Sequence, residues 1–138
     1  MAPIVSTVEV GVPPAEAFAY ITDVERFPEW QRDVVGVRAD RDRFMTTRRF
    51  ARAERTLTQE IVDNQPPRTW SARGVDGPIR PIATLTVEPL GAGSRITLAL
   101  DYEGYGLGRA LLPLVRRQTR AGAPVSLANL KKRLEGPH

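Results

Sequence analysis

The sequence of 138 residues contains no cysteine and a single histidine, His138. The absence of cysteine excludes disulfides, thiolate nucleophiles and sulfur-ligated metal sites. His138 is the last residue, and because chain ends are usually frayed, it is a poor candidate for a positioned general base. A histidine-containing triad and a His-ligated zinc are therefore not expected. Any chemistry has to use Asp, Glu, Tyr, Arg, Lys or water, and we expect neither a metal nor another cofactor.

Long apolar runs are also missing. No stretch approaches the roughly 18 to 20 residues that cross a bilayer, and the N-terminal segment lacks the basic and apolar regions of a signal peptide. We therefore expect a cytoplasmic protein without a membrane span. Hydrophobic residues make up 41% and charged residues 26% of the chain, as in ordinary globular proteins. The length fits a single domain covering residues 1–138.

Lysine is scarce, because Lys131 and Lys132 are the only two, and arginine carries nearly all of the positive charge behind the net charge of +4. A basic surface attracts phosphate non-specifically, which raises the question of nucleic acid. The charges alternate with acids over much of the chain, as between Arg38 and Arg43. This alternation favours a solvated surface over a continuous basic stripe, so nucleic acid is not the expected partner.

The first third of the chain predicts one strand and two short helices. β-branched residues are frequent in residues 4–12, which is typical of a strand covered on one face. Pro14 suits the first turn of a helix, since proline lacks only an N–H that a helix start leaves unpaired. This helix is expected to end near residues 22–23, and a second helical segment is expected within residues 24–31.

From residue 34 onward the apolar pattern has period two, which predicts successive antiparallel strands. Strands are expected around residues 34–37, 44–50, 57–61, 69–74, 79–88 and 95–102, separated by short loops rich in Gly, Pro, Asn and Asp. The alternation is clear in one of them, where Leu57, Gln59 and Ile61 form one row. Thr56, Thr58 and Glu60 form the other.

The last third of the chain has a helical pattern from Leu111 to Leu134 that stops at glycine and proline. Pro113 is early enough to be tolerated, whereas Pro124 is expected to kink or interrupt the helix, leaving one long helix or two pieces. The segment 104–108 carries three glycines without the spacing of a nucleotide-binding loop, and we interpret it as a flexible hinge.

These elements predict an α+β fold. An antiparallel sheet of about six or seven strands has one apolar face to cover, and only the C-terminal helix is long enough to lie across it. The sheet is therefore expected to curl around that helix. A curved sheet leaves an apolar space beneath the helix, and such concave spaces bind small ligands.

Several local strings carry a family resemblance along the whole chain. They are Val8-Glu9-Val10 ahead of residues 13–23, Phe27-Pro28-Glu29-Trp30, Gln65-Pro66-Pro67-Arg68, and residues 106–114 running into residues 130–135. With this order of elements the chain resembles the START-like (SRPBCC) superfamily with the helix-grip fold, in particular its polyketide cyclase/dehydrase and lipid-transport branch. One departure is the short connection around residues 40–42, which leaves the shape of the pocket mouth open.

The resemblance implies a cavity for a small hydrophobic ligand, either polyketide, aromatic or lipid-like. Trp30 is either a lid over the entrance or a plug that closes the sheet end, while Trp70 and Tyr102 either grip a planar ligand or pack the core. The expected ligand-binding residues are Trp30, Phe50, Trp70, Leu85, Leu98, Leu111 and Val115.

An enzymatic role is the alternative, because members of this branch also help to cyclise or dehydrate polyketides. Arg48 would stabilise an enolate, while Tyr102 and the carboxylate of Glu60 would move protons. The charged strand residues considered for the interior are Arg48, Arg52, Glu60, Asp101 and Glu103. A register one residue different would place such residues in solvent. A third hypothesis is an interaction module that uses the arginine-rich strands, and the oligomeric state stays open.

Overall fold

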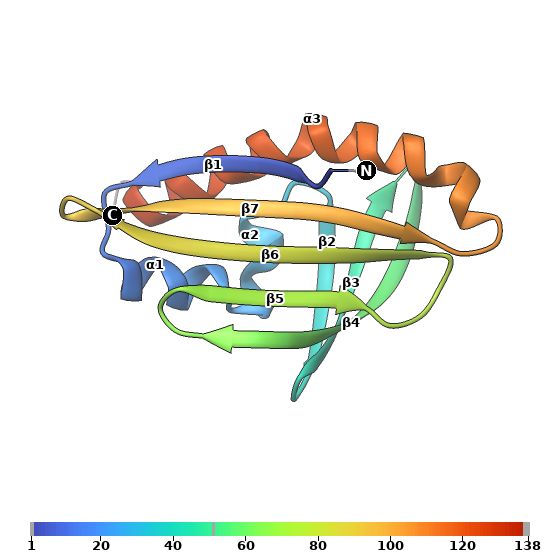
Figure 1. Cartoon of the computed structure of the whole chain (residues 1–138), viewed down its shortest axis with the longest axis horizontal. Coiled ribbons are helices and arrows are strands. Elements are labelled where there is room, and N and C mark those ends of the chain that lie inside the picture. Colours follow the sequence, from blue (N-terminus) through green and yellow to red (C-terminus); the bar gives the residue numbers. More distant parts are fainter. Residues whose placement is uncertain (1, 51, 137–138) are drawn as a thin grey trace.

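A computed structural model describes residues 2–50 and 52–136; His138 lies outside them. One sheet of seven strands in the order β1-β7-β6-β5-β4-β3-β2 faces a long helix, α3 (Figure 1). Every neighbouring pair is antiparallel. The predicted α+β helix-grip fold, with two short helices after the first strand, is confirmed. The elements are β1 (Ile4–Val10), α1 (Pro14–Ile21), η1 (Val24–Arg26), α2 (Phe27–Trp30), β2 (Val34–Asp40), β3 (Arg43–Phe50), β4 (Ala53–Gln65), β5 (Thr69–Gly74), β6 (Ile79–Leu90), β7 (Gly93–Gly104) and α3 (Gly108–Glu135).

The sheet is strongly curved. Figure 1 shows β2 and β3 running across the direction of β6 and β7, so that the strands wrap partly around the space below α3. The register keeps apolar side chains of neighbouring strands on one face, with Leu85 of β6 opposite Leu98 of β7. Because side chains alternate along a strand, this register creates a continuous apolar concave face.

The long helix α3 is continuous through Pro113 and Pro124, so of the two alternatives left by the sequence, one long helix or two pieces, the first is formed. A proline at position 124 removes the hydrogen bond to the carbonyl of residue 120. Arg120 and Pro124 are both exposed, so water can hydrate that carbonyl and the helix continues.

The glycine-rich segment before α3 forms a tight corner. Gly106 has a positive φ of 58°, a conformation that glycine adopts without strain. Gly108 is buried, and a Cβ atom at this position would collide with the carbonyl of Pro78. The same carbonyl accepts a hydrogen bond of 2.8 Å from the backbone N–H of Tyr105. Close backbone packing therefore accounts for Gly108.

The core is closed at one end by α1 and α2 and at the side by α3. Phe27 of α2 makes edge-to-face contacts with Trp30, Phe44 and Trp70, at ring-centroid distances of 5.8, 5.9 and 6.1 Å. Helix α3 packs mainly against β1, β7 and α2. Helix α3 lies further from β3, β4 and β5, and this separation leaves space for a cavity between the helix and these strands. No helix among residues 2–50 and 52–136 has the length and apolar content to cross a bilayer.

Candidate functional site

A cavity of about 400 Å³ lies between the concave face of the sheet and α3. This volume is within the range of pockets that hold small ligands. Its walls are mostly apolar, with contributions from α2, from five of the strands and from α3. The apolar lining consists of Phe27, Trp30, Phe44, Phe50, Leu57, Trp70, Ile79, Pro81, Ala83, Leu85, Leu98, Leu100, Leu111, Val115 and Ala123.

Most of the site residues predicted from the sequence lie together around this cavity. All seven expected ligand-binding residues lie on the cavity wall, as do Arg48 and Tyr102. Trp30 is 2% exposed and packs on Phe27, so it forms part of the closed end of the cavity. Trp70 belongs to the hydrophobic core and Tyr102 binds Thr119, and both side chains also line the cavity.

Glu60 does not join this group. It faces the outer surface of the sheet, where its carboxylate pairs with Arg43 at 3.4 Å and with Arg73 at 3.7 Å. Both arginines are its direct neighbours in the register of β3 and β5. Since side chains alternate along β4, the inward position next to Glu60 belongs to Gln59.

The other charged candidates on the strands also lie away from the cavity. Arg52 is exposed in the turn between β3 and β4 with a φ of 66°, and Glu103 is exposed. Asp101 pairs with the buried Arg116 of α3 at 2.9 Å. Of the five charged strand residues considered, all of them in the described part of the chain, Arg48 alone lines the cavity.

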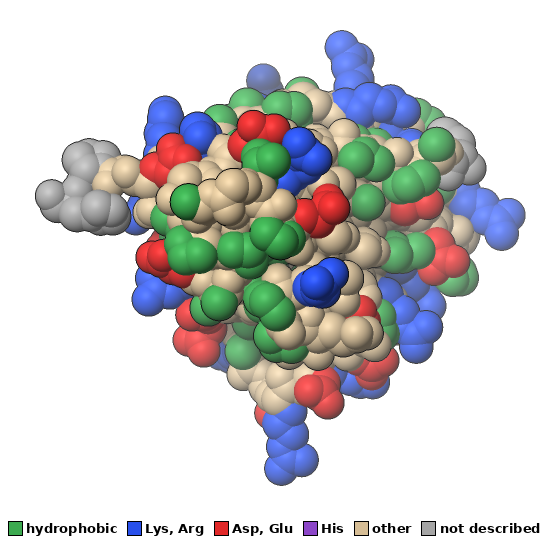
Figure 2. Space-filling model, turned by 60° about the vertical axis from the view of Figure 1, so that its left-hand side comes forward, with side chains coloured by type: hydrophobic (Ala, Val, Ile, Leu, Met, Phe, Trp, Pro, Cys, Tyr) green, Lys and Arg blue, Asp and Glu red, His purple; other side chains and the backbone are tan. Residues whose placement is uncertain are grey.

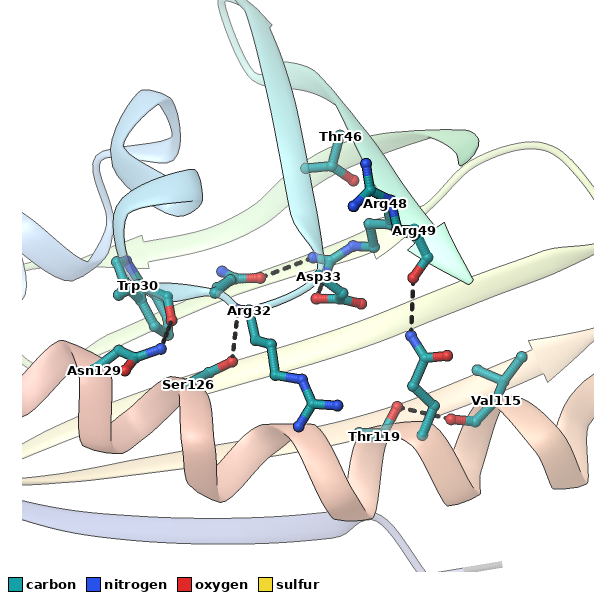
Figure 3. Close-up of polar contacts among 12 residues, drawn as sticks. Trp30, Arg32, Asp33, Thr46, Arg48, Arg49, Val115, Thr119, Ser126 and Asn129 are labelled. Carbon is teal, nitrogen blue, oxygen red and sulfur yellow. Dashed lines mark hydrogen bonds and ion pairs between the residues drawn. The ribbon is translucent and has the colours of Figure 1, made fainter. Parts of the chain in front are cut away.

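Arg48 is held in a polar network at the cavity wall (Figure 3). Its guanidinium donates to Asp33 Oδ1 at 3.1 Å and to Gln31 Oε1 at 3.0 Å. Asp33 and Gln31 come from the segment that links α2 to β2, and both line the cavity. The carboxylate of Asp33 lies beside the guanidinium of Arg48, and this ion pair balances the positive charge of the arginine.

Tyr102 of β7 contributes a phenol to the cavity wall. Its hydroxyl lies 2.6 Å from Thr119 Oγ1, and Thr119 in turn donates to the carbonyl of Val115 at 3.0 Å. The phenol is therefore the donor to Thr119. Burial raises the pKa of Tyr102 above its ordinary value of 10.0, and the Thr119 hydroxyl, which would turn to donate to a phenolate, opposes this shift only in part. Tyr102 is a protonated hydrogen-bond donor at neutral pH.

Small residues on α3 give the cavity its depth. Gly122, Ala123 and Ser126 face the sheet, and a Cβ atom on Gly122 would meet nothing within 4 Å. Ser126 Oγ accepts a hydrogen bond of 3.0 Å from the backbone N–H of Arg32, which ties α3 to the end of α2 (Figure 3). If α3 carried larger side chains at these positions, as closely packed helices do, they would fill this space.

Sequence reasoning missed several polar groups of the cavity: Gln31, Asp33, Gln59 and Thr119. For Gln59 a signal existed, since it interrupts the apolar row of Leu57 and Ile61. Within residues 2–50 and 52–136, no three Asp, Glu or His side chains converge on a point that could hold a metal ion.

Basic and acidic side chains are mixed over the surface. On the face drawn in Figure 2, Lys and Arg side chains are distributed around the outline with Asp and Glu between them. Several strand arginines have carboxylate partners, such as Arg49 with Glu54 at 3.3 Å and Arg95 with Glu9 at 3.4 Å. On this face, the described Lys and Arg side chains do not form one continuous basic patch.

Comparison with known proteins gives the family and the fold. A sequence model of the family described as "Polyketide cyclase / dehydrase and lipid transport" matches residues 1–135. No curated protein matches the chain.

Among solved structures, a protein from Thermus thermophilus is similar at 19% identity and a TM-score of 0.77, covering 96% of each chain. The Zhui aromatase/cyclase from a Streptomyces species is similar at 12% identity and a TM-score of 0.76, covering 96% of this chain and 92% of that one. A START superfamily protein from Mycobacterium smegmatis is similar at 15% identity and a TM-score of 0.69, covering 97% of each chain. At these identities the similarity shows the fold alone.

Proposed function

Since this chain belongs to the polyketide cyclase/dehydrase and lipid transport family, we propose that it binds a small, mostly apolar molecule in the cavity below α3. The observation that carries this proposal is the cavity itself, about 400 Å³ with a mostly apolar lining. A space of this size would be filled in an ordinary protein core, because interiors pack as densely as organic crystals. The lining suits a polyketide, an aromatic compound or a lipid-like chain.

Gly122 supports this interpretation. A glycine in the middle of a helix costs about 1 kcal/mol relative to alanine, and nothing in the packing demands one here, since a Cβ atom would meet open space. The neighbouring Ala121 is exposed on the same helix. A glycine at the inward position keeps the cavity open at the expense of helix stability.

The test is a pair of matched substitutions on α3. Gly122→Leu would fill the cavity, whereas Ala121→Leu adds the same side chain on the exposed side. We expect Gly122→Leu to weaken binding of the neutral fluorescent probe N-phenyl-1-naphthylamine at least tenfold, about 1.4 kcal/mol, without lowering the unfolding midpoint. Ala121→Leu should bind as the wild type does. Unchanged binding in Gly122→Leu, or no binding to the wild type, would contradict the proposal.

A second candidate function is ring closure or dehydration of a polyketide-like ketone. It is favoured by the presence of Arg48, Asp33 and Tyr102 on one cavity wall, where Arg48 and Asp33 lie close enough to influence the pKa of Tyr102. Asp33 would remove a proton from the carbon next to a carbonyl, and Arg48 would stabilise the enolate oxygen. Tyr102 would protonate the departing hydroxyl, which leaves as water as the carbon–carbon double bond forms.

This candidate differs from the sequence-based site in its carboxylate, which is Asp33 in place of Glu60. We expect the wild type to accelerate the dehydration of 4-hydroxy-4-phenylbutan-2-one, followed by the absorbance of the enone. Tyr102→Phe and Arg48→Ala should abolish the acceleration, while Glu60→Gln, on the outer face, should leave it intact. Equal rates with and without wild-type protein would reject the enzymatic role and leave ligand binding standing.

A further inference from the structure

We infer that the side-chain amide of Gln59 recognises an oxygen atom of the ligand, so that the bound molecule is a flat carbonyl compound and not a pure hydrocarbon. This inference rests on the proposed binding function and specifies its ligand class. It depends on where Gln59 lies, on which of its two polar atoms is free, and on what surrounds it.

Gln59 lies in the apolar wall of the cavity. It belongs to the inward row of β4 and is 3% exposed. Its direct partner in the register is Phe44 of β3, which also faces inward. A glutamine in this row is unusual, because buried amides are costly unless all their polar atoms are paired.

The orientation of the amide follows from its neighbour Thr46. Thr46 is fully buried, and its hydroxyl donates to Gln59 Oε1 at 3.1 Å. Among residues 2–50 and 52–136, this hydroxyl forms no other hydrogen bond. Exchanging the oxygen and nitrogen of Gln59 would leave the Thr46 proton without an acceptor. The carbonyl end of the amide is therefore turned toward Thr46.

The nitrogen end of the amide is left for the cavity. Gln59 Nε2 donates to no residue of the described chain. Two other side-chain nitrogens, Trp30 Nε1 and Arg116 Nε, are completely buried and have no hydrogen-bond partner. Gln59 Nε2 is not buried in this way. Because Gln59 lines the cavity, its amide protons are accessible to a molecule bound there.

Several other donors on the cavity wall are already engaged or hydrated, while the buried Ser126 hydroxyl, which accepts from the backbone N–H of Arg32, is a second neutral group on the wall. Arg48 binds Asp33 and Gln31, and Tyr102 binds Thr119. Gln31 also carries an amide nitrogen, but this side chain is partly exposed, so that water can serve it. Gln59 is thus a deeply buried neutral donor that a ligand can use. A neutral donor in an apolar wall suits a neutral acceptor such as a ketone or quinone oxygen.

The surroundings of Gln59 favour a flat molecule. Phe44 lies opposite it, and the ring of Phe44 is tilted by 35° to that of Trp70 at a centroid distance of 6.1 Å. Both rings line the cavity. Aromatic faces beside a hydrogen-bond donor match a ring system that carries a carbonyl group.

The experiment compares two probes of the same skeleton, 1-tetralone and tetralin, which differ by the carbonyl oxygen. Their dissociation constants are measured by calorimetry for the wild type, Gln59→Leu and Glu60→Gln. Because the ketone is better hydrated than the hydrocarbon, the decisive quantity is the change in the ratio of the two constants between proteins. We expect Gln59→Leu to shift this ratio at least tenfold toward tetralin, and Glu60→Gln to leave it unchanged.

The outcomes separate the two proposals. If tetralin and tetralone bind to the wild type and the ratio is the same in Gln59→Leu, the role of Gln59 is overturned while the binding function stands. If neither probe binds to the wild type, both proposals fail for flat carbonyl compounds. Should Gln59→Leu not fold, Thr46→Val serves as the second variant. It releases the amide from its fixed orientation, and it should reduce the preference for tetralone.

Discussion

Gln59 and Glu60, neighbours in β4, point to opposite faces of the sheet. Gln59 is 3% exposed and bonds to Thr46 on the cavity side. Glu60 bridges Arg43 and Arg73 on the outer side, so that a row of charges crosses three strands. One peptide unit therefore separates a group that can contact a ligand from a group that stabilises the surface of the sheet.

Replacing Glu60 tests the outer side. The Glu60→Gln substitution breaks two ion pairs whose arginines have side chains 60% and 62% exposed. Exposed pairs contribute little, so the free energy of unfolding should fall by less than about 1 kcal/mol in urea titrations. Probe binding should not change. A loss of binding would show that the outer face communicates with the cavity.

The helix position of Gly122 predicts a stabilising substitution. Gly122→Ala should raise the free energy of unfolding by about 1 kcal/mol, because alanine is the better helix former and its Cβ atom has room. The reverse change at the exposed neighbour, Ala121→Gly, should lower it by a similar amount. Thermal unfolding measures both. A destabilised Gly122→Ala variant would mean that the helix face is more closely packed than the structure shows.

The pair formed by Arg48 and Asp33 predicts coupling. Their side chains are 25% and 33% exposed and are 3.1 Å apart. Asp33→Asn and Arg48→Met should each lower the free energy of unfolding by about 1 to 2 kcal/mol, since each leaves a partly buried group without its partner. The double variant should lose less than the sum of the two. Additive losses in urea unfolding would indicate that the ion pair is not formed.

Tyr20 predicts a dependence of stability on alkaline pH. Its hydroxyl donates to Glu29 at 2.6 Å, and burial together with this carboxylate raises the pKa of Tyr20 from 10.0 to about 12. A raised pKa means that its stabilising effect is complete below pH 10 and is lost as the pH rises toward 12.

The variant Tyr20→Phe lacks the titrating group. It should be less stable than the wild type by about 1 kcal/mol at pH 7, a value reduced for partial exposure of the pair. The difference should shrink between pH 10 and pH 12, as followed by urea unfolding. The pKa of Tyr102 is also raised, but Tyr102 is present in both proteins, so its effect on stability cancels in the difference between them. A difference that is constant with pH would show that Tyr20 does not bind Glu29.

The fold could be predicted because its signals are local and periodic. Alternation with period two identified the strands, and the long apolar pattern after residue 110 identified α3. The same alternation separates Gln59 from Glu60, yet the expectation for Glu60 followed the chemistry of its carboxylate and not the row to which it belongs. The sequence signal for Gln59 was a polar side chain in an apolar row.

Other parts of the cavity have no such signal. Asp33 lies in the short link between α2 and β2, where no periodicity indicates the direction of a side chain. Thr119 faces the cavity because of the rotation of α3 about its axis, which is set by packing against β1 and β7. The continuity of the helix at Pro124 likewise depends on which carbonyls face water, a tertiary property.

The pairing of β1 with β7 has a consequence for the order of folding. Val10 lies opposite Ser94, and the last turns of α3 return to the same strand, where Lys131 binds the carbonyl of Glu9 and Glu135 binds the backbone N–H of Gly11. During synthesis β1 is made before β7 and α3, and it stays without these partners until both have been made. The contacts that complete the domain are thus among the most distant in sequence, which slows folding and leaves an early apolar strand in need of protection.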